Sequence, residues 1–168
     1  MPIQLDHNKT SFIKKQFPIT LICDRVNSPA NMGSLFRIAD SFGVEQIYFC
    51  GEEITVMSKR MERTARSTHK IIPYHEEDDI ILVIDTLKEK GYTILALEIT
   101  ENSVAIDTYQ PNVGDKIALV IGEENLGVSD QVLEKAANAL HINMFGNNSS
   151  MNVATATAIA LYELTKSL

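Results

Sequence analysis

Residues 116–130 read KIALVIGEENLGVSD, and the expected fold follows from them. The first six residues are mostly apolar, as is typical of a buried β-strand. Gly122 and Gly127 then bracket a polar turn. Ser129 is a favoured N-cap residue, so we expect a helix over 129–137. A strand, a short turn and a helix in this order predict one unit of a parallel α/β sheet.

The same alternation extends along the rest of the chain. Short apolar runs predict further strands at 19–23, 46–50, 70–74, 92–99 and 139–144. Apolar residues at helical spacing predict helices at 34–42, within 59–70, at 80–90 and over about 151–166. We therefore expect an α/β fold, a mostly parallel sheet with helices on both faces. Ligands of such sheets bind beyond the carboxyl ends of the strands.

Composition limits the class of protein. The chain has 168 residues, 45% of them apolar and 22% charged, which predicts one domain over 1–168 with 1–18 as an N-terminal extension. No apolar run approaches the ~18 residues of a membrane span, and the N-terminus has no apolar signal core. Cys23 and Cys50 are expected to be buried thiols, and no Cys/His spacing indicates a metal. We expect a cytoplasmic protein that binds neither a membrane nor a metal.

The net charge of −7 is unevenly distributed. Residues 1–70 carry ten Lys/Arg against seven Asp/Glu, whereas residues 71–168 carry five against fifteen. The densest basic stretch is 59–70, KRMERTARSTHK. Because the Debye length is only ~8 Å at physiological salt, this stretch can contact phosphates although the whole protein is acidic. The alternative is a solvated helical surface.

The turn 122–127, GEENLG, is the first of three polar segments with possible chemistry. Its terminal glycines permit close backbone approach to a ligand, and its two glutamates disfavour a phosphate. They suit a ligand with hydroxyl, ammonium or sulfonium groups. Neither a GxGxxG nor a GxxxxGK[ST] motif occurs in the chain. The alternative is an ordinary strand-to-helix turn.

The other two segments are 31–37, NMGSLFR, and 143–152, NMFGNNSSMN. Arg37 faces away from the apolar stripe of its helix, where it can bind a phosphate bidentately. The alternative is a solvated arginine paired with Asp40. Ser149 or Ser150 can cap the last helix, but a cap does not explain the density of amide side chains. That helix is apolar nearly all round, so we expect part of it to pack against a second subunit.

Taken together, in this order and spacing, the three segments resemble the SpoU (TrmH-like) group of SPOUT RNA methyltransferases. The matching residues are Asn31, Gly33 and Arg37, the turn 121–127, and 142–153 with Ser150 and Asn152. The resemblance extends over about residues 19–168. One departure is Asn143, where the family usually has proline.

The resemblance implies a C-terminal deep trefoil knot, a homodimer, and methylation of a ribose 2′-hydroxyl in RNA. It implies that S-adenosylmethionine is bound through backbone groups near Leu97, Gly122, Ile142, Met144 and Ser150. The catalytic residues that it implies are Arg37, Asn31, Glu124, Ser150 and Asn152. Arg37 either removes the hydroxyl proton or only clamps a substrate phosphate. The residues expected to bind RNA are Arg25, Arg37, Arg60, Arg63 and Arg66.

We expect tRNA as the substrate, with rRNA as the alternative. Two other classes of function remain. One is a catalytically silent RNA-binding module on the same fold, and the other is an unrelated doubly wound enzyme that acts on a small molecule. The local basic stretch favours a polyanionic substrate over a small metabolite.

Overall fold

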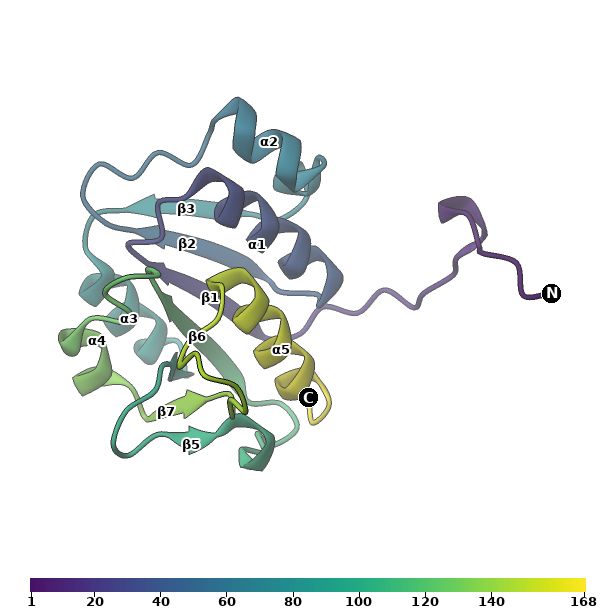
Figure 1. Ribbon diagram of the computed structural model, residues 1–168. Coiled ribbons are helices and arrows are strands. Elements are labelled where there is room, and N and C mark those ends of the chain that lie inside the picture. The colour runs from purple at the N-terminus through teal and green to yellow at the C-terminus, as the bar shows by residue number, and fades with distance from the viewer.

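A parallel sheet of seven strands forms the centre of the computed structural model, which describes residues 1–168 (Figure 1). The strand order is β3-β2-β1-β6-β4-β7-β5, and every paired strand runs parallel to its neighbour. The strands are β1 (Ile19–Asp24), β2 (Gln46–Cys50), β3 (Tyr74–Glu77), β4 (Tyr92–Leu97), β5 (Val104–Ala105), β6 (Lys116–Gly122) and β7 (Asn138–His141). The expectation of a mostly parallel sheet is confirmed.

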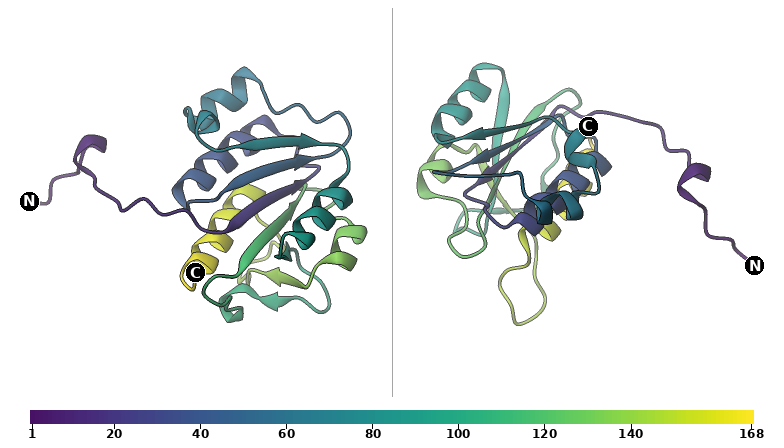
Figure 2. Two further views of the ribbon diagram at one scale, coloured as in Figure 1. Left: turned by 180° about the vertical axis from the view of Figure 1, so that it is seen from behind. Right: turned by 90° about the horizontal axis from the view of Figure 1, so that it is seen from above.

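Helices cover both faces of this sheet. Helices α1, α2 and α5 lie on one face, and α3 and α4 lie on the other, as the view from behind shows (Figure 2). Their bounds are α1 (Pro29–Ser41), α2 (Lys59–Ala65), α3 (Ile80–Glu89), α4 (Asp130–Lys135) and α5 (Val153–Thr165). Successive side chains of a strand point to opposite faces of the sheet. Leu21 therefore lies in the same core as Phe36, and Ile22 lies with Ile84 in the core on the other face.

Helix α1 begins at Pro29, earlier than the expected Ser34. Ser28 Oγ accepts from the Asn31 N–H, and proline is favoured in the first helical turn because it has no N–H to satisfy. Asn31 and Gly33 therefore lie inside the helix and not in the preceding loop. Helix α5 begins after its N-cap Asn152, so neither Ser149 nor Ser150 caps it.

Three expected strands differ from the structure, and one of them, 92–99, ends two residues early at Leu97. The third strand is Tyr74–Glu77 and not 70–74, and Thr68–Lys70 forms a 3-10 turn. β3 lies at the edge of the sheet and is mostly exposed, so it lacks the apolar run that predicts a strand. The last strand ends at His141 because its pairing with β4 and β5 stops there. The two-residue strand β5 was not expected.

Residues 1–14 are exposed and extend away from the body of the protein (Figures 1 and 2). Contact with the body begins at Lys15, whose Nζ donates to the Leu168 carbonyl, and continues at Phe17, whose N–H donates to the Gly43 carbonyl. Cys23 and Cys50 are buried free thiols, as expected, and belong to the cores on opposite faces of the sheet. None of the helices combines the length and the hydropathy that crossing a membrane requires.

Candidate functional site

A cavity of about 550 Å³ lies at the carboxyl ends of β4, β6 and β7. Its position is the one expected for a ligand site in a parallel sheet. Its volume falls within the range of about 300–1,000 Å³ that is usual for small-molecule sites. The wall includes every residue that the resemblance assigns to the cofactor: Leu97, Gly122, Ile142, Met144 and Ser150.

The wall of this cavity is anionic. Glu98, Glu123 and Glu124 line it, no lysine or arginine does, and His141 is the remaining ionisable side chain. Fixed negative charge attracts a cation and repels a phosphate. The cavity therefore suits a ligand that carries an ammonium or sulfonium group beside apolar parts.

The segment 142–151 offers free peptide groups to the cavity. None of its N–H or C=O groups makes a hydrogen bond to another backbone group of the protein. Ile142, Met144 and Ser150 place such groups at the cavity wall. Because backbone donors and acceptors need partners, this segment can bind a ligand through its main chain.

Glu123 stabilises the turn 122–127 from within. Its Oε2 accepts from the N–H groups of Leu126 and Asn125, at 2.8 Å each, and its Oε1 accepts from Asn125 Nδ2 at 3.0 Å. The bond from Leu126, followed by those from Asn125, lowers the pKa of the Glu123 carboxyl below its ordinary value. A Cβ at Gly122 would overlap the backbone of Gly127, so this tight turn requires a glycine.

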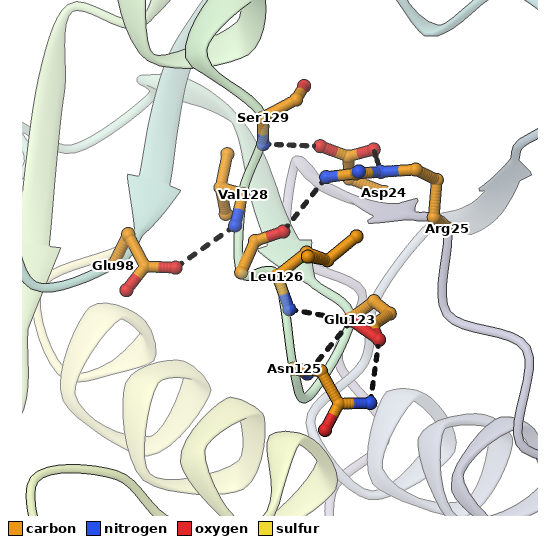
Figure 3. A network of polar contacts seen from close by, with 9 residues as sticks. Asp24, Arg25, Glu98, Glu123, Asn125, Leu126, Val128 and Ser129 are labelled. Carbon is orange, nitrogen blue, oxygen red and sulfur yellow. Dashed lines mark hydrogen bonds and ion pairs between the residues drawn. The ribbon is translucent and has the colours of Figure 1, made fainter.

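Two carboxylates hold the residues that follow this turn (Figure 3). Glu98, next to the end of β4, accepts from the Val128 N–H at 3.0 Å through Oε2. Asp24, at the end of β1, accepts from the Ser129 N–H at 2.7 Å through Oδ2. Two successive amides are thus held from two different strands. This occupies the Ser129 N–H, and Ser129 makes no side-chain cap for α4.

Arg25 completes the arrangement around Asp24 (Figure 3). Its Nε donates to Asp24 Oδ1 at 2.9 Å, and a terminal nitrogen donates to the Gly127 carbonyl at 3.1 Å. The backbone of Arg25 is left-handed, with φ 60°, a conformation that costs about 1–2 kcal/mol for a residue with a Cβ. The side chain that we expected to face RNA is therefore turned toward the loop after β6, with 39% of its surface exposed.

A second network joins three of the expected catalytic residues. Asn152 Oδ1 accepts from the N–H groups of Ala154 and Thr155, as the cap of α5. That contact fixes the orientation of the amide, because only the oxygen can accept. Asn152 Nδ2 then donates to Asn31 Oδ1 at 3.0 Å and to Glu124 Oε1 at 2.9 Å.

The same reasoning fixes the orientation of Asn31. Since Asn31 accepts through Oδ1, its Nδ2 points away from Asn152 and carries two free hydrogens. Asn31 is 8% exposed, and its Nδ2 is not among the buried side-chain atoms that lack a partner. The structure therefore presents an oriented amide donor at the start of α1.

Arg37 and Ser150 stand apart from this network. Arg37 is exposed on α1 and makes no ion pair with Asp40 or with Glu124. Ser150 lines the cavity, and its hydroxyl makes no hydrogen bond within the protein. Glu124 accepts from Asn152 and also lines the cavity.

Gly33 brings α2 against α1. A Cβ at this position would lie 2.6 Å from the Met61 carbonyl oxygen and 2.6 Å from Thr64 Cβ, closer than atoms approach in proteins. The glycine of the motif therefore serves a contact between helices and not a contact with a ligand. It holds the basic helix α2 alongside the helix that carries Arg37.

The basic stretch 59–70 is folded and largely exposed. Arg60, Arg63 and Arg66 are exposed, and none of them forms an ion pair. His69 is different, because its side chain is 7% exposed and its Nε2 lies 3.7 Å from Glu62 Oε1. The three arginines are thus free to contact a polyanion, whereas His69 packs against the protein.

Sequence reasoning missed Glu98 and Asp24. Glu98 was counted within an apolar strand, and Asp24 was counted as the first residue of a loop. The signal that could have identified them is one acidic residue at the carboxyl end of each of two apolar strands. No group of three or more His, Cys, Asp or Glu side chains comes together in the structure as a metal site would require.

The family model and similar curated proteins indicate the same family. The model of the SpoU rRNA Methylase family matches residues 18–162. A putative TrmH family tRNA/rRNA methyltransferase of Staphylococcus saprophyticus is 31% identical over 144 residues, which are 86% of this chain and 57% of the relative. A tRNA (guanosine(18)-2′-O)-methyltransferase of Aquifex aeolicus is 30% identical, over 89% of this chain and 70% of the relative.

Solved structures agree with these relatives. The AdoMet-bound rRNA methyltransferase from Sinorhizobium meliloti superposes with a TM-score of 0.81 at 26% identity, and the match covers 89% of this chain and 56% of that one. The chain spans little more than half the length of this neighbour and of the Staphylococcus relative.

Proposed function

The chain belongs to the SpoU rRNA Methylase family, and we propose that it transfers a methyl group from S-adenosylmethionine to a ribose 2′-hydroxyl of tRNA. The observation that carries this proposal is the hydrogen-bonded set of Asn31, Asn152 and Glu124, beside a cavity with an anionic wall. These side chains come from α1, from the cap of α5 and from the turn after β6, and they meet only in the folded chain.

The cavity fits the cofactor of this proposal. S-adenosylmethionine carries a sulfonium and an ammonium group, which suit a wall lined by three carboxylates and by no basic side chain. Its adenosine and carboxylate groups suit the free peptide groups of 142–151. We assign its binding to the backbone near Leu97, Gly122, Ile142, Met144 and Ser150. When bound, the cofactor supplies an electrophilic methyl group.

The residues of the chain then position the acceptor. A ribose hydroxyl is a poor nucleophile, so it needs an in-line approach and a route for its proton. We assign to Arg37 a bidentate grip on the phosphate next to the reacting ribose, because its guanidinium is exposed and unpaired. The proton passes to that phosphate or to water, since arginine remains protonated at ordinary pH. The Asn31 amide donates to an oxygen of the same nucleotide, with Asn152 and Glu124 as its support and Ser150 beside it.

The proposed RNA surface is the pair of helices α1 and α2. Arg37 lies on one, and Arg60, Arg63 and Arg66 lie on or end the other, all without protein partners. The close contact at Gly33 keeps the two helices together. A local basic surface on a chain with a net charge of −7 gives salt-dependent binding to RNA.

We also propose that the protein acts as a homodimer through α5. This helix buries one face against the body, yet Ile159 and Tyr162 remain 36% and 57% exposed on another. Phe42 extends this apolar surface, because its ring lies 6.5 Å from that of Tyr162. Covering such a surface by a second copy removes apolar area from water. A knotted C-terminal segment, a cytoplasmic location and independence of metal complete the proposal.

A cofactor-binding measurement and a methylation assay test this function. Titration calorimetry is expected to show that the protein binds S-adenosylmethionine in the presence of EDTA. Incubation with tRNA and cofactor is then expected to methylate ribose. Binding of RNA without any binding of the cofactor would instead establish a silent RNA-binding module. Methylation of rRNA but not of tRNA would show that rRNA, the alternative substrate, is the correct one.

A further inference from the structure

We propose that Asp24 and Arg25 are positioning residues that hold the loop 127–129 in its ligand-binding shape, so that Arg25 acts on cofactor affinity and not on RNA. This inference rests on the proposed function, because it takes the cavity as the site of S-adenosylmethionine. It changes the role that the sequence suggested for Arg25.

The contacts of the loop carry the inference (Figure 3). The Gly127 carbonyl accepts from Arg25, and the Ser129 N–H donates to Asp24. Between them, the Val128 N–H donates to Glu98. Each of these three consecutive residues thus has a backbone group held by a side chain from the end of β1 or β4. Gly127 and Val128 line the cavity, so the shape of that wall depends on these bonds.

The Asp24 carboxylate is buried and therefore needs hydrogen-bond partners. Its side chain is 3% exposed, and its two oxygens accept from Ser129 and from Arg25. A buried carboxylate needs such partners, because an unpaired charge away from water is costly. Arg25 is therefore the counter-ion of Asp24 as well as a donor to the loop.

The backbone of Arg25 supports the same role. Its left-handed φ of 60° is rare for a residue with a long side chain. The Arg25 N–H donates to the Cys50 carbonyl of the adjacent strand, which fixes the turn. In this conformation the side chain reaches back across the sheet to the loop after β6. Strain that is held in this way often marks a functional position.

The test compares variants at Arg25 with a charge-matched control. Arg25→Asn removes the guanidinium, yet asparagine tolerates the left-handed backbone, so the protein is expected to fold. Lys88→Asn removes one positive charge from the exposed end of α3 and serves as the control. Arg25→Lys keeps the charge beside Asp24 but lacks the rigid fork that reaches both acceptors.

We expect Arg25→Asn to weaken S-adenosylmethionine binding about tenfold in calorimetry and to raise the KM for the cofactor. We expect kcat at saturating cofactor and the affinity for RNA to stay near their wild-type values. Hydrogen exchange is expected to quicken at the Ser129 amide, because its acceptor Asp24 loses its counter-ion. The Val128 amide should change less, because its acceptor Glu98 makes no contact with Arg25. Arg25→Lys should recover part of the cofactor affinity, and Lys88→Asn should change none of these quantities.

The outcomes separate the inference from the function on which it rests. Wild-type protein that fails to bind S-adenosylmethionine would overturn the proposed function itself. Wild-type binding together with unchanged cofactor affinity in Arg25→Asn would overturn only the role of the pair. Loss of RNA affinity with unchanged cofactor affinity would return Arg25 to the RNA surface.

Discussion

Asn152 Nδ2 lies 3.0 Å from Asn31 Oδ1, and this bond joins the cap of α5 to the first turn of α1 across 121 positions of the sequence. One side chain thereby does two things. Its oxygen caps a helix, and its nitrogen orients Asn31 and contacts Glu124. The two roles can be separated by substitution.

Asn152→Asp is expected to keep the cap and lose the network. A carboxylate still accepts from the first N–H groups of α5, but it has no hydrogen to donate to Asn31. We expect a free energy of unfolding within about 1 kcal/mol of the wild type, measured in urea. The single-turnover rate of methyl transfer should fall about 100-fold, because Asn31 no longer holds the ribose that accepts the methyl group in the right orientation. Asn152→Ala should lose about 1 kcal/mol of stability as well. A full rate in Asn152→Asp would refute this role.

Arg37→Ala is expected to reduce the methyl-transfer rate by orders of magnitude while S-adenosylmethionine affinity barely changes. Arg37 is exposed and lies outside the cavity, so its loss leaves the cofactor wall intact. Arg37→Lys should recover little, since a point charge cannot replace a bidentate fork. Single-turnover kinetics and calorimetry measure the two quantities. A rate near the wild-type value for Arg37→Ala would show that this arginine is not in the active site.

Replacing Arg60, Arg63 and Arg66 together by alanine is expected to weaken RNA binding and to flatten its salt dependence. Each lost phosphate contact should reduce the slope of log K against log salt by roughly 0.7–0.9. The single-turnover rate at saturating RNA should survive, because these side chains do not line the cavity. Binding titrations at several salt concentrations give the slope. An unchanged slope would mean that α2 faces solvent in the complex.

If the protein is the proposed homodimer, Tyr162→Asp is expected to convert it to a monomer. The side chain is 57% exposed beside Phe42, and a carboxylate in a buried apolar interface would be unpaired. Leu82→Asp is the matched control, because Leu82 is 63% exposed on α3, on the other face of the sheet. Sedimentation at micromolar concentration measures the mass. Wild-type protein that sediments as a monomer would contradict the proposed interface.

Both thiols are expected to resist reagents in the folded protein. Burial raises the pKa of the Cys50 thiol to about 12 and also raises that of Cys23, and the thiolate is the reactive form. At pH 8 a disulfide reagent should label neither cysteine until the protein is unfolded. Because the folded pKa values exceed the unfolded ones, the two neutral buried thiols contribute to the free energy of unfolding below the unfolded pKa of about 8.5–9. That contribution should be lost as the pH rises above this value. Rapid labelling of native protein would contradict the buried placement.

Much of the fold followed from local pattern. The strand Gln46–Cys50 and the turn after β6 were predicted where they occur, because an apolar run bounded by glycine or polar residues leaves few alternatives. The edge strand Tyr74–Glu77 was missed, since an exposed strand carries no such run. The start of α1 was placed too late because its first turn, 29–33, is as polar as a loop.

The site was predicted in part. The residues expected at the cofactor all line the cavity, and three of the expected catalytic residues meet in one network. The roles of Asp24 and Glu98 depend on which strands lie side by side, and strand order is not a local property. The packing role of Gly33 was also missed, because its contact is with the helix α2, and a contact between helices is not a local property of the sequence.

The proposed function is tested most directly by nucleoside analysis of RNA after the reaction. RNA from cells that lack this gene is incubated with the protein and with S-adenosylmethionine that carries a labelled methyl group. The RNA is then digested, and its nucleosides are separated and identified by mass spectrometry. We predict label on the ribose 2′-oxygen of one nucleoside of tRNA, present with the wild type and nearly absent with Asn152→Asp. Label on a base, or no label from protein that binds both RNA and cofactor, would contradict the assignment of this chain as a ribose 2′-O-methyltransferase.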